Sequence, residues 1–335
     1  VYKRQPMIAP SPHDAGTAFL VFDDHRRGNM ASYVYKVEEY GRRWTALSTT
    51  GMSGYALSVL QDPVNPDLLF TGTEFGLFVS IDGGESWTKF TAGVPTVSVM
   101  DMAIQERESD LVLGTHGRSV YVIDDYSALR EVSPADFDTR LRILSATDGQ
   151  QYATNPTAST RFTGNGEFRG ENEPYGVMVT FVANGDDLPH PDDQKERERK
   201  IAKRQNADSA TEDDDEPGNK KDSGKVTIKV SNTDGEVIRT YKRNVHQGIN
   251  RLTWGMQSDG IRRAPGSNRP DRGNGLPPGP EIVPGAYRIE LSLGEESSAI
   301  DVQVLADPRA GLSAEEYLAN YQARVSLQDL RESSV

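Results

Sequence analysis

Cysteine is absent from the 335 residues of this chain. Its absence excludes disulfide bonds, cysteine-ligated zinc sites and thiol nucleophiles, and it leaves the redox compartment open. Long apolar runs are also missing, because no segment approaches the roughly 18 consecutive apolar residues of a membrane-spanning helix. The first residues, VYKRQPMIAP, lack the apolar region of a signal peptide and begin without methionine. We therefore interpret the chain as a fragment whose leader sequence, if it has one, lies outside it.

Positive charge is the next deficit. The chain has 37 Lys and Arg against 50 Asp and Glu, which leaves a net charge of -13. A nucleic-acid-binding protein needs a basic face to neutralise phosphates, so we predict no nucleic-acid partner. The phosphate-binding loop, the dinucleotide fingerprint and the G-x-S-x-G nucleophile elbow are absent too. We predict no cofactor.

An internal repeat organises the first half of the chain. Placing Trp44 over Trp87 aligns YVYKVEEYGRRWTAL with GLFVSIDGGESWTKF at an offset of 43 residues. The segment LVLGTHGRSVYVIDD then repeats LLFTGTEFGLFVSID, with Gly72 over Gly114 at an offset of 42. Periods near 40 to 45 residues are typical of β-propeller blades.

Each repeat reads as four short strands. In the middle copy these are YALSVLQ, LLFTGT, GLFVSI and WTKF, separated by turns rich in Gly, Asp, Asn and Pro. Four antiparallel strands of this total length make one propeller blade, and a few blades imply a larger ring. We predict that residues 1–153 form the last two to three four-stranded blades of a propeller.

The segment SIDGGESW matches the Asp-box pattern S-x-D-x-G-x-S-W. A tight turn between the third and fourth strands needs a carboxylate that accepts backbone N–H groups, a glycine with positive φ and a ring that packs beneath the hairpin. None of these roles requires a substrate. We predict a structural Asp-box, in full in the middle copy and in part in the first. Its residues are Ser80, Asp82, Gly84, Ser86 and Trp87, with Glu39, Gly41 and Trp44 in the first copy.

A second β-rich region follows a linker at residues 154–173. Strand-like segments occur between residues 174 and 306, and TDGE supplies an Asp-Gly hairpin turn. We predict an immunoglobulin or fibronectin-like β-sandwich there, with Trp254 in its core. Residues 186–224 are charged and almost free of apolar side chains, so we expect a disordered insertion. At residues 311–335 we predict the start of a short C-terminal helical segment, with Ser313 as its N-cap.

The chain resembles a family of large bacterial proteins with sortilin-like Asp-box (BNR) propellers, often labelled glycosyl hydrolases. The resemblance rests on SPHDAGTAFLVFDDHR, YVYKVEEYGRRW, DPVNPDLLFTGTEFGLFVSIDGGESW and DLVLGTHGRSVYVIDDYSALREV, followed by the sandwich and ADPR. It covers most of the chain outside the charged insertion. It implies a propeller followed by an immunoglobulin-like domain in an exported, extracytoplasmic protein, either periplasmic or secreted. The disulfide-rich ligand-binding module of sortilin has no counterpart in this cysteine-free chain.

Strand direction predicts where a ligand could bind. In an antiparallel blade, turns between the second and third strands lie at the opposite end from the Asp-box turns. Loops gathered on one rim of a rigid scaffold commonly carry binding or catalytic residues. We predict that the ligand-binding rim consists of Asp24, His25, Arg26, Glu74, Phe75, His116 and Arg118.

The rim has a catalytic and a non-catalytic interpretation. A glycoside hydrolase needs two carboxylates roughly 5 to 10 Å apart, for which Asp24 and Glu74 are the candidates. In simpler roles, Asp24 caps a turn and Glu74 pairs with an arginine. Phe75 is nearly the only aromatic residue in these turns, which favours a charged peptide or protein ligand over a sugar. The motifs HDAG and DDHR lack a third ligand cluster, so we predict no metal site.

Two functions follow from these features. The first is a non-catalytic exported binding or scaffolding protein whose ligand is a protein, peptide or glycan. The second is a glycoside hydrolase of the Asp-box propeller type, with its catalytic residues mainly in blades outside the chain. The oligomeric state and the total number of blades stay open at this point.

Overall fold

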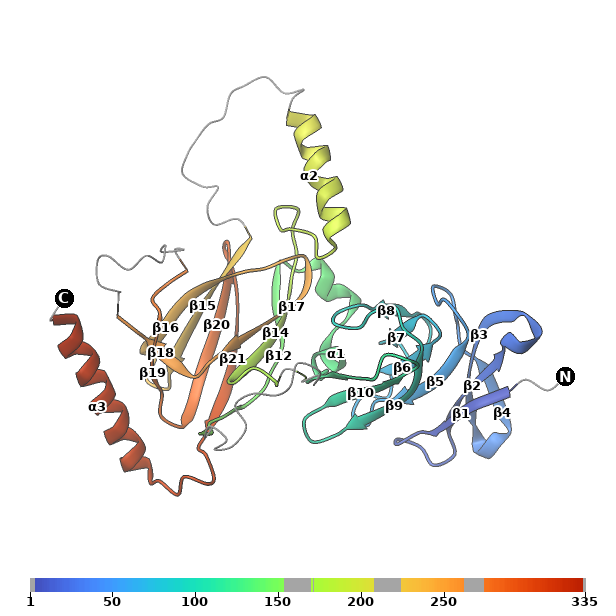
Figure 1. Ribbon diagram of the computed structural model, residues 1–335, viewed down its shortest axis with the longest axis horizontal. Coiled ribbons are helices and arrows are strands. Elements are labelled where there is room, and N and C mark those ends of the chain that lie inside the picture. Colours follow the sequence, from blue (N-terminus) through green and yellow to red (C-terminus); the bar gives the residue numbers. More distant parts are fainter. Residues whose placement is uncertain (1–3, 154–169, 171, 208–223, 262–273, 334–335) are drawn as a thin grey trace. The chain divides into compact units, whose positions relative to one another are not determined.

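The computed structural model describes residues 4–153, 170, 172–207, 224–261 and 274–333. The chain divides into two compact units, Val1–Ser133 and Pro134–Val335. Strands make up most of the regular structure of both units (Figure 1). The predicted all-β class is therefore confirmed.

The first unit contains three antiparallel sheets, and in each of them the strands pair in chain order. The first sheet consists of β1 (Arg4–Pro10), β2 (Ala18–Asp24), β3 (Asn29–Glu38) and β4 (Arg43–Ala46). The second consists of β5 (Ala56–Gln61), β6 (Leu69–Thr73), β7 (Gly76–Ser80) and β8 (Thr88–Phe90). The third consists of β9 (Val99–Gln105), β10 (Asp110–Thr115) and β11 (Val120–Ile123), and the short helix α1 (Ala128–Glu131) follows it. Two sheets thus have the four-stranded meander of a propeller blade, and the third has three strands.

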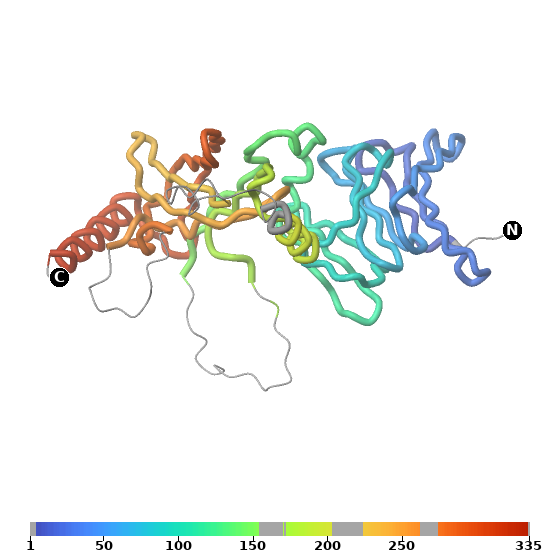
Figure 2. The backbone as a smooth tube through the Cα atoms, turned by 90° about the horizontal axis from the view of Figure 1, so that it is seen from above, coloured from blue at the N-terminus to red at the C-terminus, as the bar shows by residue number. Residues whose placement is uncertain are grey.

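Two hydrophobic clusters hold these sheets together. Phe19 and Val21 of the first sheet pack against Val59 and Phe78 of the second. A separate cluster joins Phe70, Leu77 and other residues of the second sheet to the third sheet through Val99, Leu111 and Leu113. The second sheet is therefore covered on both faces, which explains why every residue of β6 and β7 is buried. Figure 2 shows the three sheets beside one another in chain order.

The boundary between the two units lies earlier than predicted. The sequence placed the end of the blades at residue 153, whereas the division falls between Ser133 and Pro134. The reason is β12 (Leu141–Ala146), which pairs along its length with β14 (Val177–Ala183) and therefore belongs to the second unit. The predicted linker at residues 154–173 lies mostly outside the described residues.

The second unit is built on two sheets. The first has the order β12-β14-β17, with β17 at Gly248–Trp254. The second has the order β13-β21-β20-β15-β16. Its strands are β13 (Gly149–Gln150), β15 (Lys225–Asn232), β16 (Val237–Asn244), β20 (Gly285–Leu293) and β21 (Glu296–Leu305). A small separate pair is formed by β18 (Gln257–Asp259) and β19 (Pro278–Glu281).

This strand order is that of an immunoglobulin-like sandwich. The order β12-β14-β17 corresponds to strands A, B and E, and β21-β20-β15-β16 corresponds to G, F, C and C′. The chain crosses from one sheet to the other between β12 and β13, and β13 pairs in parallel with β21. The topology that strand patterns alone left open is thus the predicted one.

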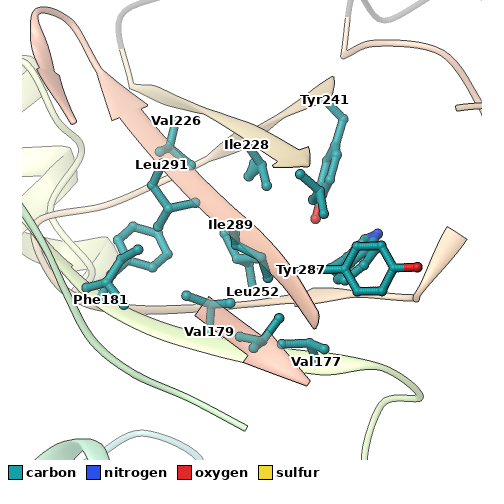
Figure 3. Packing of buried hydrophobic residues seen from close by; sticks show 14 of the residues in the cluster. Val177, Val179, Phe181, Val226, Ile228, Tyr241, Leu252, Tyr287, Ile289 and Leu291 are labelled. Atoms are coloured by element: carbon teal, nitrogen blue, oxygen red, sulfur yellow. The ribbon is translucent and has the colours of Figure 1, made fainter. Parts of the chain in front are cut away.

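The sandwich core also carries a tyrosine corner. Tyr287, near the start of β20, donates its hydroxyl to the carbonyl oxygen of Val283 at 2.7 Å, four residues upstream. The ring of Trp254 lies edge-on to Tyr287 with 5.5 Å between ring centroids, and its indole N–H donates to the Gln257 carbonyl. Figure 3 shows Tyr287 among Val177, Ile289 and other residues that fill the space between the sheets. Trp254 is only 1% exposed, as its predicted core role requires.

The charged insertion is partly ordered, which corrects the prediction of disorder from residue 186 onward. Leu188 is fully buried in the sandwich core, and helix α2 covers Asp193–Ala207. Asp192 accepts the first backbone N–H groups of the helix, and Glu196 pairs with Arg199 at 2.8 Å. Charges spaced three or four residues apart stabilise a helix without apolar burial, and low hydrophobicity alone does not reveal this. Residues 208–223 of the predicted insertion lie outside the described residues.

The predicted C-terminal helix is present as α3 (Ala314–Ser333). Its N-terminus has the expected capping box, because the backbone N–H of Glu316 donates to Ser313 Oγ and the backbone N–H of Ser313 donates to Glu316 Oε2.

Candidate functional site

The turns of the first unit lie at opposite ends of its strands. In each sheet, the turn between the second and third strands is at one end and the turn between the third and fourth strands is at the other. The β6–β7 turn holds Glu74 and Phe75, whereas the β7–β8 turn holds the Asp-box. The two candidate regions can therefore be compared separately.

The Asp-box turn closes on itself through hydrogen bonds. Asp82 Oδ1 accepts the backbone N–H of Ser86 at 3.0 Å and the hydroxyl of Ser80 at 2.7 Å. Its Oδ2 accepts the hydroxyl of Ser86, and Ser80 Oγ also accepts the backbone N–H of Gly84 at 2.8 Å. Burial raises the pKa of Asp82, but these hydrogen bonds lower it further, so the carboxyl group has a pKa below its usual value.

Gly84 and Trp87 fix this turn against the first sheet. Gly84 has φ of +95°, and a Cβ there would lie 2.7 Å from a methyl group of Leu47. Trp87 is 7% exposed and belongs to the cluster between the first two sheets. Each of these contacts is internal to the protein.

The first repeat keeps only part of this arrangement. Glu39, Tyr40 and Gly41 all have positive φ, so the turn between β3 and β4 is tight here as well. Trp44 donates its indole N–H to the Gly41 carbonyl at 3.0 Å, yet it is 53% exposed and lies against Phe22. The third copy keeps Asp125, whose Oδ1 accepts the backbone N–H of Ser127.

At the opposite end, the β2–β3 turn contains a buried carboxylate that holds a histidine. The side chain of Asp23 is 1% exposed, and its Oδ1 lies 2.6 Å from His25 Nδ1. The same oxygen accepts the backbone N–H of His25 at 2.9 Å. The His25 ring stacks on Tyr55 with 4.4 Å between ring centroids and 18° between the planes.

The β6–β7 turn lies against the same tyrosine. The backbone N–H of Glu74 donates to the Tyr55 carbonyl at 3.2 Å. A Cβ added to Gly54 would lie 2.9 Å from both Glu74 Cβ and Phe75 Cδ2, so these two turns approach each other closely. Phe75 is 42% exposed. The structure thus brings His25, Tyr55, Glu74 and Phe75 together.

The other rim residues are distributed differently. Asp24 forms an ion pair with Arg27 at 2.6 Å, in keeping with a role inside the turn, and Arg26 is exposed. His116 and Arg118 are exposed in the β10–β11 turn, where the His116 backbone N–H donates to Ser98. No contact seen in residues 4–153 joins His116 or Arg118 to Glu74.

Asp23 and Tyr55 were not predicted as site residues. The alternation in β2 contains a signal for Asp23, because Phe19, Val21 and Asp23 occupy successive positions on the buried face. A carboxylate at a core-facing position needs a partner, and His25 is that partner. Tyr55 could be located only from the fold, since its contacts come from other parts of the chain.

Two further features are defined for the described part of the chain alone. No group of three or more His, Cys, Asp or Glu is arranged there to hold a metal ion. None of the helices described is long and apolar enough to cross a membrane.

Comparison with known proteins gives limited similarity. No protein-family model and no curated protein matches the chain. A solved GH74 enzyme from Niastella koreensis is 21% identical over 36% of this chain and 21% of its own, with a TM-score of 0.32. An ancestral GH74 enzyme is 18% identical over 34% of this chain and 14% of its own, with a TM-score of 0.29.

A third solved structure aligns with more of the chain. It is the extracellular domain of a protein from B. thetaiotaomicron described as a one component system, and it is 12% identical. The alignment covers 90% of this chain and 30% of that structure, with a TM-score of 0.25. The chain spans less than a third of each of the three structures, and similarity at this level assigns no function.

Proposed function

We propose that this chain is part of a non-catalytic, exported binding or scaffolding protein. On this proposal, residues 1–133 are blades of a sortilin-like Asp-box propeller, and the Asp-box is a structural turn. The ligand is a protein, peptide or glycan. It contacts the rim that carries His25, Glu74 and Phe75.

The observation that carries the proposal is the exposure of Phe75 on a rigid support. An aromatic ring that is 42% exposed is available to a partner, and aromatic side chains are enriched in protein interfaces. The support is rigid because Thr73 Oγ1 accepts the Phe75 backbone N–H and donates to the Ser53 carbonyl at 2.8 Å. A pre-ordered surface loses little conformational entropy when it binds.

The same geometry favours binding over hydrolysis. A glycosidase of the usual kind places two carboxylates on either side of the sugar. Asp24 is paired with Arg27, and Asp23 is buried against His25. Glu74 is then the accessible carboxylate of these turns, and a single carboxylate suits a ligand contact.

The first experiment is to probe peptide and glycan arrays with the full chain and two variants. Phe75→Ala is expected to weaken binding about tenfold or more, since truncating a central interface residue commonly costs more than 1 kcal/mol. Tyr40→Ala is the matched control, because Tyr40 is an 85% exposed aromatic residue at the Asp-box end. Equal loss in both variants, or no binding by the wild-type chain, would refute the proposal.

A glycoside hydrolase is the second candidate, and one observation favours it. Asp23, His25, Tyr55 and Glu74 together supply the carboxylate, imidazole and phenol groups used in acid–base catalysis. The test is hydrolysis of polysaccharides and sialosides by the wild-type chain and by Glu74→Gln. Turnover that disappears in Glu74→Gln would establish the hydrolase and end the non-catalytic proposal.

A further inference from the structure

The Asp23–His25 pair determines which ring nitrogen of His25 faces a ligand. A carboxylate oxygen only accepts hydrogen bonds, so His25 Nδ1 carries the proton that is donated to Asp23 Oδ1. In neutral His25, Nε2 is then an acceptor. Within the described residues Nε2 has no hydrogen-bond partner, and the side chain is 31% exposed. His25 therefore offers an oriented acceptor to solvent.

Glu74 supplies a second acceptor close by. Among the described residues its carboxylate has no ion-pair or hydrogen-bond partner, and its backbone is tied to Tyr55, on which His25 stacks. Burial raises the pKa of the Tyr55 hydroxyl, and the negative charges of Glu74 and Asp23 raise it further. Both carboxylates thus act on the same point of the rim.

The charge balance of these turns is negative. Arg27 is neutralised by its ion pair with Asp24. The carboxylates of Asp23 and Glu74 then outnumber the one guanidinium of Arg26 on the same turns. Negative potential and groups that mainly accept hydrogen bonds suit a ligand that carries donors and positive charge.

We propose that the β2–β3 and β6–β7 turns form a subsite for a basic side chain of a peptide ligand, with His25 Nε2 and the Glu74 carboxylate as acceptors. The exposed Phe75 ring is the apolar wall of the subsite. Arginine and lysine side chains are donors only, and they are attracted to aromatic faces as well as to carboxylates. This subsite rests on the binding function proposed above and names its ligand chemistry.

Four anchors hold the subsite in place before a ligand arrives. Ser32 donates its hydroxyl to the Gly54 carbonyl, and Gly54 has φ of +76° in the space between the two turns. Thr73 holds the Ser53 carbonyl, and Asp23 holds His25. A pre-formed site for one charged side chain gives specificity for a basic residue at one position of the peptide.

The test uses an acetylated hexa-arginine peptide as the probe, titrated into the full chain by calorimetry at about 0.15 M salt. Nonspecific attraction to an acidic chain is the main competing effect. Glu74→Gln is compared with Glu85→Gln, which removes the same charge from an exposed residue in the Asp-box turn. We expect Glu74→Gln to weaken binding about 10- to 100-fold, as for loss of a hydrogen bond to a charged group, and Glu85→Gln to change it less than about twofold.

Equal effects of the two variants, or no binding of hexa-arginine by the wild-type chain, would overturn the subsite. Binding of a neutral oligosaccharide that Glu74→Gln weakens, without binding of hexa-arginine, would overturn it in favour of a glycan. In that case the rim would still bind a ligand, so the proposed function would stand. An absence of all array binding would instead remove the proposed function itself.

A second measurement examines His25 directly. The chain has five histidines, so their ring nitrogens can be resolved by nuclear magnetic resonance of nitrogen-15. We expect His25 to be in the tautomer with a proton on Nδ1, and its Nε2 resonance to shift when hexa-arginine is added. The opposite tautomer, or an Nε2 resonance that does not respond to bound hexa-arginine, would contradict the proposed contact.

Discussion

Replacing Asp62 by alanine is expected to lower the free energy of unfolding of the first unit by about 3 to 5 kcal/mol. The side chain of Asp62 has no exposed surface, and both its oxygens lie 3.0 Å from Arg130 Nε. Tyr126 donates its hydroxyl to Asp62 Oδ1 at 2.6 Å, and the backbone N–H groups of Val64 and Asn65 donate to Oδ2. Alanine leaves a largely buried guanidinium and three other donors without their acceptor.

Hydrogen exchange measured by mass spectrometry distinguishes the two units. We expect Asp62→Ala to reduce protection in β5 and β10, while β14 and β20 of the second unit keep theirs. Glu108→Ala is the control, because the Arg107–Glu108 pair is exposed on both sides and should contribute under about 1 kcal/mol. Unchanged protection in the first unit would contradict the structural role of Asp62.

The same residue predicts part of the acid sensitivity of the chain. Burial raises the pKa of Asp62, but the hydrogen bonds from Arg130, Tyr126 and the backbone outweigh burial, so its pKa lies below the usual value. A lowered pKa stabilises the folded state above the unfolded-state pKa of about 4, and this contribution is lost as pH falls through the folded-state pKa. Asp62→Ala should therefore lose less stability on acidification than the wild-type chain.

Replacing Trp254 by alanine is expected to destabilise the second unit by about 3 to 5 kcal/mol. Trp254 is 1% exposed and lies between the two sheets against Tyr287. Truncation removes a large buried ring and leaves a cavity that the surrounding strands can fill only in part. It also leaves the Gln257 carbonyl without the indole N–H that it accepts at 3.0 Å. Urea unfolding followed by exchange at β14, β17 and β20 measures the loss.

Trp44 provides the matched control. It is 53% exposed, and its ring contacts Phe22 and Tyr35 on the surface of the first sheet. Trp44→Ala should cost roughly 1 kcal/mol, the contribution of surface aromatic contacts. Comparable losses from Trp44→Ala and Trp254→Ala would contradict the placement of Trp254 at the centre of the sandwich.

Local patterns predicted the elements whose contacts lie close together in sequence. The Asp-box bonds join Ser80, Asp82 and Ser86, and the capping box joins Ser313 and Glu316, so the spacing alone contains the geometry. The blade-like strands and the all-β class followed from turns and alternation for the same reason. These interactions need no knowledge of the rest of the fold.

Features that depend on distant segments were missed or misplaced. Tyr55 reaches His25 and Glu74 only after three strands have formed, and no local pattern marks it. The end of the first unit was placed too late because β12 finds its partner more than thirty residues further along the chain. Pairing across such distances depends on tertiary packing, which residue spacing does not encode.

The most direct test of this account is to compare the affinity of the best array ligand for the wild-type chain, Asp82→Asn and Glu74→Gln, after confirming that all three are folded. Asparagine can keep the acceptor that Asp82 offers to Ser86, so we expect Asp82→Asn to bind like the wild-type chain. Glu74→Gln should bind about tenfold more weakly or worse. The reverse order, with binding lost in Asp82→Asn and kept in Glu74→Gln, would place the functional site in the Asp-box and contradict the account.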